Sequence, residues 1–304
     1  MKVVISYKNA DLDGVASAVG YSEYLNMIGE EASYYLNGSY QREVDLLCSM
    51  FQINLSNLLD NLDNSFIIVV DTNTYWAVDF VSKDKIVEII DHHPPSFDIF
   101  PNASIQLEDI GAVCTLIAEK FHRKNLVPSR DTAILLYYGI VSNTINFKSL
   151  NTTNRDKNMA KWLKDNCSDI DSNKIRELFE MKSMFPISHL RESMEIEEKF
   201  ILDDNEWYIG QLEIVSAKEF LNKNINSIRK IMDDVKREYH TNYVFLNIVD
   251  IIEGYHIIYC PFSETKNILK RYGYSFYDDM FIEDKFVLRK DIKKRLRGKL
   301  KDDF

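Results

Sequence analysis

Three apolar runs that end in acidic or imidazole side chains constrain the fold of this chain most strongly. The runs cover residues 2–6, 65–70 and 85–90. Buried parallel strands are nearly continuous in apolar residues, and a parallel sheet presents the residues that follow its strands at one edge. The residues that follow the three runs are Asp11 and Asp13, then Asp71, then Asp91, His92 and His93. The sequence therefore predicts a cluster of carboxylates and imidazoles at the carboxyl edge of a parallel sheet.

Helical spacing of apolar residues appears between and after these runs. The predicted helices cover residues 14–28, 43–50, 112–121 and 131–141. Strands that alternate with helices are typical of a parallel sheet with crossover helices. We therefore predict an α/β fold, with a doubly wound parallel sheet in the N-terminal part.

The second part of the chain has a different pattern. Residues 155–184 have a polar helical pattern, which Pro186 interrupts. A β-rich region follows and includes residues 207–213, 242–250 and 255–260, with a helix predicted over 217–238. We therefore predict two domains, 1–186 and 194–304, with a boundary between them near 186–194.

Composition excludes several classes of protein. The chain has 304 residues with 45% hydrophobic residues, which suffices for real cores. Its net charge of -10 argues against a generic duplex binder, which needs a basic face. We expect no membrane span, because no apolar run approaches the roughly 20 residues required. The apolar start is too short for a signal peptide and the four cysteines are far apart, so we expect a cytoplasmic protein with reduced thiols.

The ligand types indicate a metal centre for phosphate chemistry. Carboxylates and a neutral imidazole suit Mn²⁺, Mg²⁺, Co²⁺ or Fe²⁺, whereas a structural zinc site favours thiolates. Asp11 and Asp13 form an Asp-x-Asp that points two carboxylates to different sides, so each could serve a different ion. Asp71 would then bridge the ions, because it stands at the end of its own strand. An isolated Asp-x-Asp is more often a loop or a helix cap, so the combination of the three motifs carries the prediction.

These motifs resemble those of the DHH phosphoesterases. Residues 8–13 with Ser17 and Ala18 resemble motif I, Asp71 lies in a Val-Asp-Thr-Asn that resembles motif II, and Asp91-His92-His93 matches the motif that names the family. Residues 108–112 and 140–149 resemble further family segments, the latter motif IV. The resemblance covers essentially the whole chain. It is strongest to the branch with the DHHA2 type of C-terminal domain, which includes manganese-dependent family II inorganic pyrophosphatases and exopolyphosphatases.

The resemblance implies a fold, a reaction and roles for individual residues. It implies a DHH domain, a smaller DHHA2-like α/β domain with a mixed sheet, and an active site in the cleft between them. The implied function is hydrolysis of pyrophosphate or a related small phosphoanhydride by a metal-activated water. The implied metal ligands are Asp11, Asp13, Asp71, His92 and Asn143, the catalytic residues His93 and Asp91, and the substrate-binding residues Lys199, Arg289 and Lys290. The implied cofactor is Mn²⁺, or Co²⁺ or Mg²⁺, with two ions or one.

Two positions depart from the family pattern. Tyr7 stands where the pyrophosphatases have a histidine ligand, and Asn143 stands where motif IV normally ends in an aspartate. A phenol is a poor ligand near neutral pH, and an amide oxygen binds cations more weakly than a carboxylate does. Two alternatives therefore stay open: an exopolyphosphatase or nucleotide phosphoesterase, and a catalytically impaired protein that binds a phosphorylated ligand. The expected partner is a small phosphorylated substrate, nucleic acid is not expected, and the family suggests a homodimer.

Overall fold

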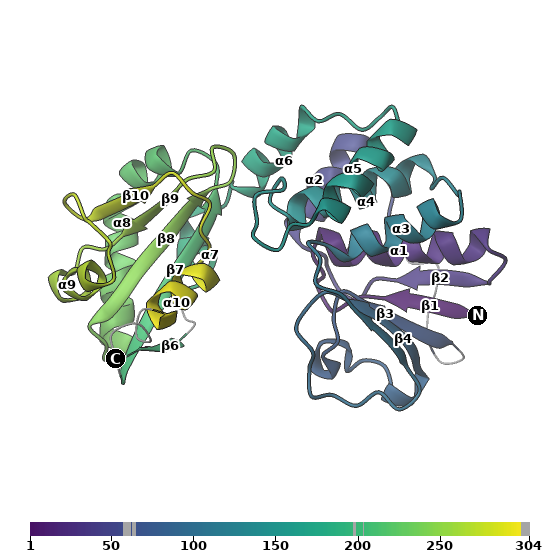
Figure 1. Ribbon diagram of the computed structural model, residues 1–304, viewed down its shortest axis with the longest axis horizontal. Helices are drawn as coiled ribbons and strands as arrows, with labels where there is room; N and C mark the ends of the chain where they lie inside the picture. The colour runs from purple at the N-terminus through teal and green to yellow at the C-terminus, as the bar shows by residue number, and fades with distance from the viewer. Residues whose placement is uncertain (57–61, 63–64, 197–198, 203, 299–304) are drawn as a thin grey trace. The chain divides into compact units, whose positions relative to one another are not determined.

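The computed structural model describes residues 1–56, 62, 65–196, 199–202 and 204–298. The remaining residues, which fall within the two predicted domains, lie outside the described part of the chain. The described chain divides into two compact units, Met1–Leu178 and Phe179–Phe304. Each unit contains its own five-stranded sheet (Figure 1). The predicted α/β fold with a parallel first sheet and a mixed second sheet is confirmed.

The first sheet is parallel throughout, in the order β2-β1-β3-β4-β5. Its inner strands are rich in β-branched residues, which favour the extended backbone. The strands are β1 (Lys2–Ile5), β2 (Ala32–Tyr35), β3 (Phe66–Val70), β4 (Ile86–Asp91) and β5 (Ser104–Leu107). The chain steps from β1 outward to β2 and then returns across β1 to β3. The strand order therefore reverses between β1 and β3, and ligands of open α/β sheets bind at such switch points.

Helix α1 (Leu12–Met27) lies at the centre of the first unit. It contacts β1, β2 and β3 on one side and α3 (Val113–Arg123) and α4 (Arg130–Asn143) on the other (Figure 1). Gly139 lets α4 approach closely, because a Cβ there would lie 2.5 Å from Cys114 Sγ and 3.4 Å from Ala16 Cβ. The opposite face of the sheet packs against a segment that includes η1 (Tyr75–Val78), through Val78, Val81 and Phe100. Further helices of this part of the chain are α2 (Arg42–Phe51), α5 (Asn154–Asn166) and α6 (Lys174–Lys182), and a second short helix is η2 (Lys83–Lys85).

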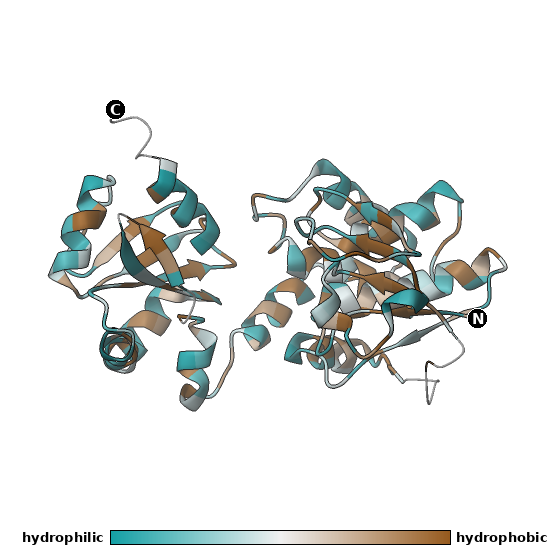
Figure 2. Cartoon of the chain, turned by 90° about the horizontal axis from the view of Figure 1, so that it is seen from below, coloured by the Kyte–Doolittle hydropathy of each residue, from teal (hydrophilic) through white to brown (hydrophobic). Residues whose placement is uncertain are grey.

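The second unit is built on a mixed sheet in the order β10-β9-β8-β7-β6. Strands β7 and β8 are parallel and the other pairs are antiparallel. Its strands are β6 (Lys199–Leu202), β7 (Asn205–Ile214), β8 (Tyr243–Asp250), β9 (His256–Tyr259) and β10 (Met280–Glu283). Its helices are η3 (Ile187–His189), α7 (Leu190–Ser193), α8 (Ala217–Glu238), α9 (Ser263–Arg271) and α10 (Arg289–Gly298). Hydrophobic residues mark the strands of both sheets, whereas hydrophilic residues are frequent on the surrounding helices (Figure 2).

Candidate metal and phosphate site

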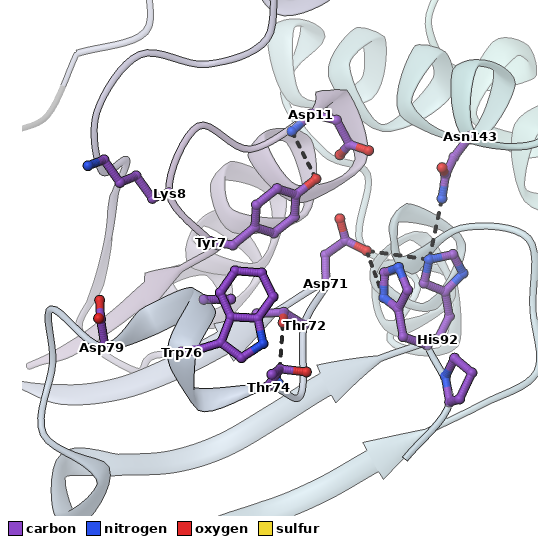
Figure 3. A pocket seen from close by; sticks show the side chains of 13 residues that line it. Tyr7, Lys8, Asp11, Asp71, Thr72, Thr74, Trp76, Asp79, His92 and Asn143 are labelled. Atoms are coloured by element: carbon purple, nitrogen blue, oxygen red, sulfur yellow. Dashed lines mark hydrogen bonds and ion pairs between the residues drawn. The ribbon is translucent and has the colours of Figure 1, made fainter. Parts of the chain in front are cut away.

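A cavity of about 660 Å³ opens in the first unit where the strand order reverses. It brings together residues that follow β1, β3 and β4 and the last residue of α4 (Figure 3). The lining residues are Tyr7, Lys8, Asp11, Asp71, Thr72, Thr74, Trp76, Ala77, Asp79, His92, His93, Pro94 and Asn143. The three sequence motifs therefore meet at one edge of the sheet. The first unit supplies every residue of this cavity.

Asp71 is a buried carboxylate at the centre of the site. Its left-handed backbone (φ 63°) turns the chain directly after β3, and a Cβ at Gly14 would lie 3.2 Å from Asp71 Oδ2. The residue is 2% exposed, and Oδ1 has no hydrogen-bond partner among the described residues. Burial, reinforced by the charges of neighbouring aspartates, raises the pKa of Asp71 well above its usual range. A buried carboxylate oxygen without a donor is costly, so this atom is suited to a cation.

His92 directs its Nε2 toward Asp71. His92 Nδ1 lies 2.9 Å from the carbonyl oxygen of Ile110, which can only accept, so Nδ1 carries the proton of the neutral ring. Nε2 therefore holds a lone pair, and it lies 3.5 Å from Asp71 Oδ1 (Figure 3). A backbone carbonyl behind one ring nitrogen is the arrangement that fixes the tautomer of metal-binding histidines.

Asp91 and His93 form a hydrogen-bonded pair beside this centre. Asp91 is fully buried, and its Oδ1 accepts hydrogen bonds from His93 Nδ1 at 2.8 Å and from the backbone N–H groups of His92 and His93. Although burial acts against ionisation, these hydrogen bonds lower the pKa of Asp91. The same carboxylate raises the pKa of His93. The His93 side chain is 55% exposed, so Asp91 holds in place an imidazole that faces the cavity.

Asp11 and Tyr7 lie on the β1 side of the cavity. Asp11 caps α1, because its Oδ1 accepts the Gly14 N–H at 3.0 Å. The Tyr7 hydroxyl oxygen accepts the backbone N–H of Asp11 at 3.1 Å. Burial, together with the charges of Asp11 and Asp71, raises the pKa of Tyr7 far above neutrality. Tyr7 is therefore a neutral phenol in the position where the family pattern has a histidine.

Asp13 and Asn143 contact each other behind the cavity. Asp13 is 1% exposed, and it caps α3 by accepting the N–H groups of Val113 and Cys114, both at 2.8 Å. Asn143 Nδ2 donates to Asp13 Oδ2 at 2.8 Å and to the carbonyl oxygen of Gly111 at 3.1 Å. The same nitrogen lies 3.5 Å from His92 Nε2. Asp13 is absent from the cavity lining, whereas Asp11 is part of it.

The donor atoms of this site suit a hard divalent cation. Asp71, Asp91, His92 and His93 can each offer an atom within 4.8 Å of the others. Of these, Asp71 Oδ1 and His92 Nε2 lack strong partners, and their 3.5 Å separation lets one ion contact both from about 2.1 Å. Oxygen and imidazole ligands without thiolate are those expected for Mn²⁺ or Mg²⁺. The residues present therefore fit a manganese ion.

The three predicted substrate-binding residues belong to the second unit. Lys199 is exposed on β6 and pairs with Glu206 on the neighbouring strand. Arg289 Nη1 donates to the carbonyl oxygens of Glu195 at 2.6 Å and Ile209 at 3.2 Å. Lys290 is exposed at the start of α10. Their role toward phosphate stays a prediction.

Sequence reasoning missed several residues that line the cavity. Lys8 brings the one lysine of the lining, Thr72 and Thr74 bring hydroxyls, and Trp76 brings a ring that is 77% exposed. Lys8 and Thr72 lie within the predicted motifs but were given no role there, and Thr74 follows the second motif directly, so proximity in sequence was a usable signal. Trp76 lies on a short helix that no motif marks.

Fold and site together define an α/β protein of the DHH type with a candidate metal-binding group. The family model described as "DHH family, N-terminal domain" matches residues 2–140. A Clostridium acetobutylicum protein named "Probable manganese-dependent inorganic pyrophosphatase" is 30% identical over 285 residues, which cover 91% of this chain and 90% of the relative. The Methanocaldococcus jannaschii protein named "Manganese-dependent inorganic pyrophosphatase" is 27% identical, with coverages of 83% and 84%. The chain belongs to the DHH family, together with these manganese-dependent inorganic pyrophosphatases.

Two solved structures support the fold. A Methanococcus jannaschii structure described as a candidate family II inorganic pyrophosphatase has a TM-score of 0.64 at 20% identity, with 98% of this chain and all of that chain covered. An exopolyphosphatase-related protein from Bacteroides fragilis has a TM-score of 0.51 at 14% identity, with coverages of 99% and 91%. In the part of the chain that the structure describes, no helix is long and apolar enough to cross a membrane.

Proposed function

We propose that this protein is a manganese-dependent phosphohydrolase that cleaves pyrophosphate or a related small phosphoanhydride. The observation that carries the proposal is the buried Asp71 Oδ1, which has no hydrogen-bond partner among the described residues and lies 3.5 Å from His92 Nε2 at the switch point of the sheet. The names of the relatives support the choice of metal and of phosphoanhydride. Asp71 and His92 would hold the ion, and Asp11 lines the same cavity.

The surrounding side chains would bind the anionic substrate against this centre. A bound divalent cation supplies positive charge for phosphoryl oxygens and lowers the pKa of water. Lys8 brings a further positive charge to the cavity, and Thr72 lies beside Asp71 in its lining. The Tyr7 hydroxyl is neutral, so it does not repel phosphate as an ionised phenolate would. The cavity therefore offers positive charge to an anion although its interior is acidic.

His93 is the residue best placed to move a proton. Its Nδ1 is held by Asp91, so its Nε2 is the nitrogen that faces solvent and substrate. The raised pKa of His93 favours the protonated ring, which can deliver a proton to the leaving phosphate as the bridging P–O bond breaks. Water supplies the oxygen of the new P–O bond, and two phosphate ions leave. In this scheme Asp91 is a positioning residue.

The size of the cavity favours substrates larger than pyrophosphate. The cavity measures about 660 Å³, which is the space of roughly 20 water molecules, and its wall includes the exposed ring of Trp76. Pyrophosphate leaves most of that volume to solvent. A short polyphosphate would fill more of it, and a nucleotide could also place its base against Trp76. Polyphosphate or a nucleotide phosphoester is therefore the second candidate.

The test is phosphate release from pyrophosphate, tripolyphosphate and a dinucleotide, each with Mn²⁺, Mg²⁺ or Co²⁺. Asp71→Asn serves as the inactive variant, because it keeps the shape of the side chain and removes its charge. Asp84→Asn is the matched control, since Asp84 is an exposed aspartate on η2 outside the cavity lining. We expect release with Mn²⁺ in the wild type and in Asp84→Asn, and none in Asp71→Asn.

The substrate pattern separates the candidates. Release from pyrophosphate alone supports the first, and faster release from tripolyphosphate or the dinucleotide supports the second. If no substrate releases phosphate while Mn²⁺ or pyrophosphate still binds, the protein is instead a binding protein in which Tyr7 and Asn143 have replaced metal ligands. The assay also tests Lys199, Arg289 and Lys290, whose alanine variants should raise KM if they contact the substrate.

A further inference from the structure

We infer that the site holds a single divalent cation per chain, because the Asn143 amide occupies the Asp13 side of the centre. The inference rests on the metal dependence proposed above and adds the number of ions and the residue that sets it. It follows from the orientation of one amide, from the hydrogen bonds of one carboxylate and from the donor atoms that remain.

The orientation of Asn143 is fixed by its neighbours. Its amide nitrogen, Nδ2, lies near three groups: Asp13 Oδ2 at 2.8 Å, Gly111 O at 3.1 Å and His92 Nε2 at 3.5 Å. The first two can only accept, and Nε2 is the acceptor nitrogen of the neutral His92 ring, because Nδ1 lies beside the carbonyl oxygen of Ile110. An amide oxygen in the same place would face three acceptors, so the NH₂ group must point there. Asn143 therefore presents donors, not a cation ligand, to this side of the centre.

Asp13 accepts three hydrogen bonds from these and other donors. Its Oδ1 accepts from Cys114 N, and its Oδ2 accepts from Val113 N and from Asn143 Nδ2, all at 2.8 Å. The N-terminus of α3 also stabilises the negative charge. A cation bound to Asp13 Oδ2 would have to displace the Asn143 NH₂ group and leave it without its shortest hydrogen bond.

The remaining donor atoms suffice for one ion. The NH₂ group has two hydrogens, and its two shorter contacts, to Asp13 and Gly111, account for both. The 3.5 Å contact leaves the lone pair of His92 Nε2 available, next to the unpartnered Asp71 Oδ1. Asp11 lines the same cavity and interacts with Asp71. Asp71 Oδ1 and His92 Nε2 thus remain as the donor atoms for one ion, whereas Asp13 acts as a structural cap.

The experiment counts Mn²⁺ ions bound to the full chain. Equilibrium dialysis with metal analysis gives the stoichiometry, and the Mn²⁺ electron paramagnetic resonance spectrum distinguishes an isolated ion from a coupled pair. We expect one ion and an isolated-ion spectrum for the wild type. Asn143→Asp replaces the donor by a carboxylate oxygen, so we expect a second ion and a coupled spectrum. Asn158→Asp adds the same charge at an exposed position of α5 and should still bind one ion.

Two results would overturn the inference. Two ions with a coupled spectrum in the wild type would show that a cation displaces the Asn143 amide. That result would leave the proposed metal dependence intact. No bound Mn²⁺ in the wild type would remove both the inference and the proposed function. A folded Asn143→Asp variant, judged by its circular dichroism, that still binds one ion would also contradict the role of Asn143. The wild-type count decides the matter even if that variant does not fold.

Discussion

Replacing Asp71 by asparagine should stabilise the metal-free protein while it abolishes metal-dependent activity. Asp71 is 2% exposed, its Oδ1 has no donor among the described residues, and neighbouring aspartates raise its pKa. An asparagine NH₂ in place of Oδ1 would lie about 3.5 Å from the His92 Nε2 lone pair and could donate to it. The substitution therefore removes a buried carboxyl group whose ionisation is disfavoured and whose Oδ1 lacks a hydrogen bond, and it adds one hydrogen bond.

The structure sets the size of the effect. One unsatisfied buried polar atom costs about 1–3 kcal/mol. For a unit of 178 residues, each kcal/mol shifts the melting temperature by about 2–4 °C. We therefore expect a rise of about 2–12 °C in the melting of the first unit, measured by calorimetry in EDTA. In the wild type, the melting transition that Mn²⁺ shifts to a different temperature is assigned to the first unit.

Asp156→Asn is the matched control, because Asp156 is also a buried aspartate but has all its partners. Its Oδ2 accepts from Gly111 N, Thr153 N and Thr153 Oγ1, and its Oδ1 accepts from Thr115 Oγ1. This variant should lose about 1–3 kcal/mol. If Asp71→Asn also melts lower than the wild type in EDTA, Asp71 has stabilising partners in the metal-free protein and Oδ1 is not a vacant cation ligand.

Three further predictions concern other parts of the chain. His93→Gln should lower kcat by about 10²–10⁴-fold. It should leave the Mn²⁺ dissociation constant unchanged, because His93 is half-exposed and paired with Asp91. If Mn²⁺ affinity falls by as large a factor as kcat, His93 is a metal ligand instead. The pKa of Glu283 is lowered to about 2 by hydrogen bonds from Lys285, Arg295 and His256, despite partial burial. Its stabilisation of the second unit should be complete above about pH 4.5 and decline toward pH 2 in acid unfolding, and Glu283→Gln should weaken that decline. Gly139→Ala should destabilise the first unit by about 1–3 kcal/mol in urea unfolding, because a Cβ there lies 2.5 Å from Cys114 Sγ.

The inner strands and most helices could be predicted from the sequence because their patterns are local. The apolar runs at 2–6, 65–70 and 85–90 correspond to β1, β3 and β4, and the helix predicted over 217–238 coincides with α8. The edge strands β2 and β5 were not predicted. Each has four residues, and none of the eight is buried, so neither shows the continuous apolar run of an inner strand.

The meeting of the three motifs at one edge of the sheet was also predictable, but the contacts that each residue makes there were not. Asp11 and Asp13 are equivalent in an Asp-x-Asp pattern, yet the structure places Asp11 in the cavity and Asp13 against α3. The difference depends on backbone N–H groups about 100 residues away, which no local pattern reveals. The orientation of Asn143 similarly depends on acceptors from three separate segments.

The cap that Asp13 provides for α3 affects when the site can form during folding. It joins the first turn of α1 to residues 100 and 101 positions later in the chain. Closing so long a loop is entropically costly, and such contacts form slowly. A nascent chain that has made β1, α1 and β3 already carries Asp11 and Asp71. It still lacks β4 and the carbonyl group of Ile110 that fixes His92. It also lacks the N-terminus of α3, which Asp13 caps. An ion bound as proposed would therefore be captured late in folding.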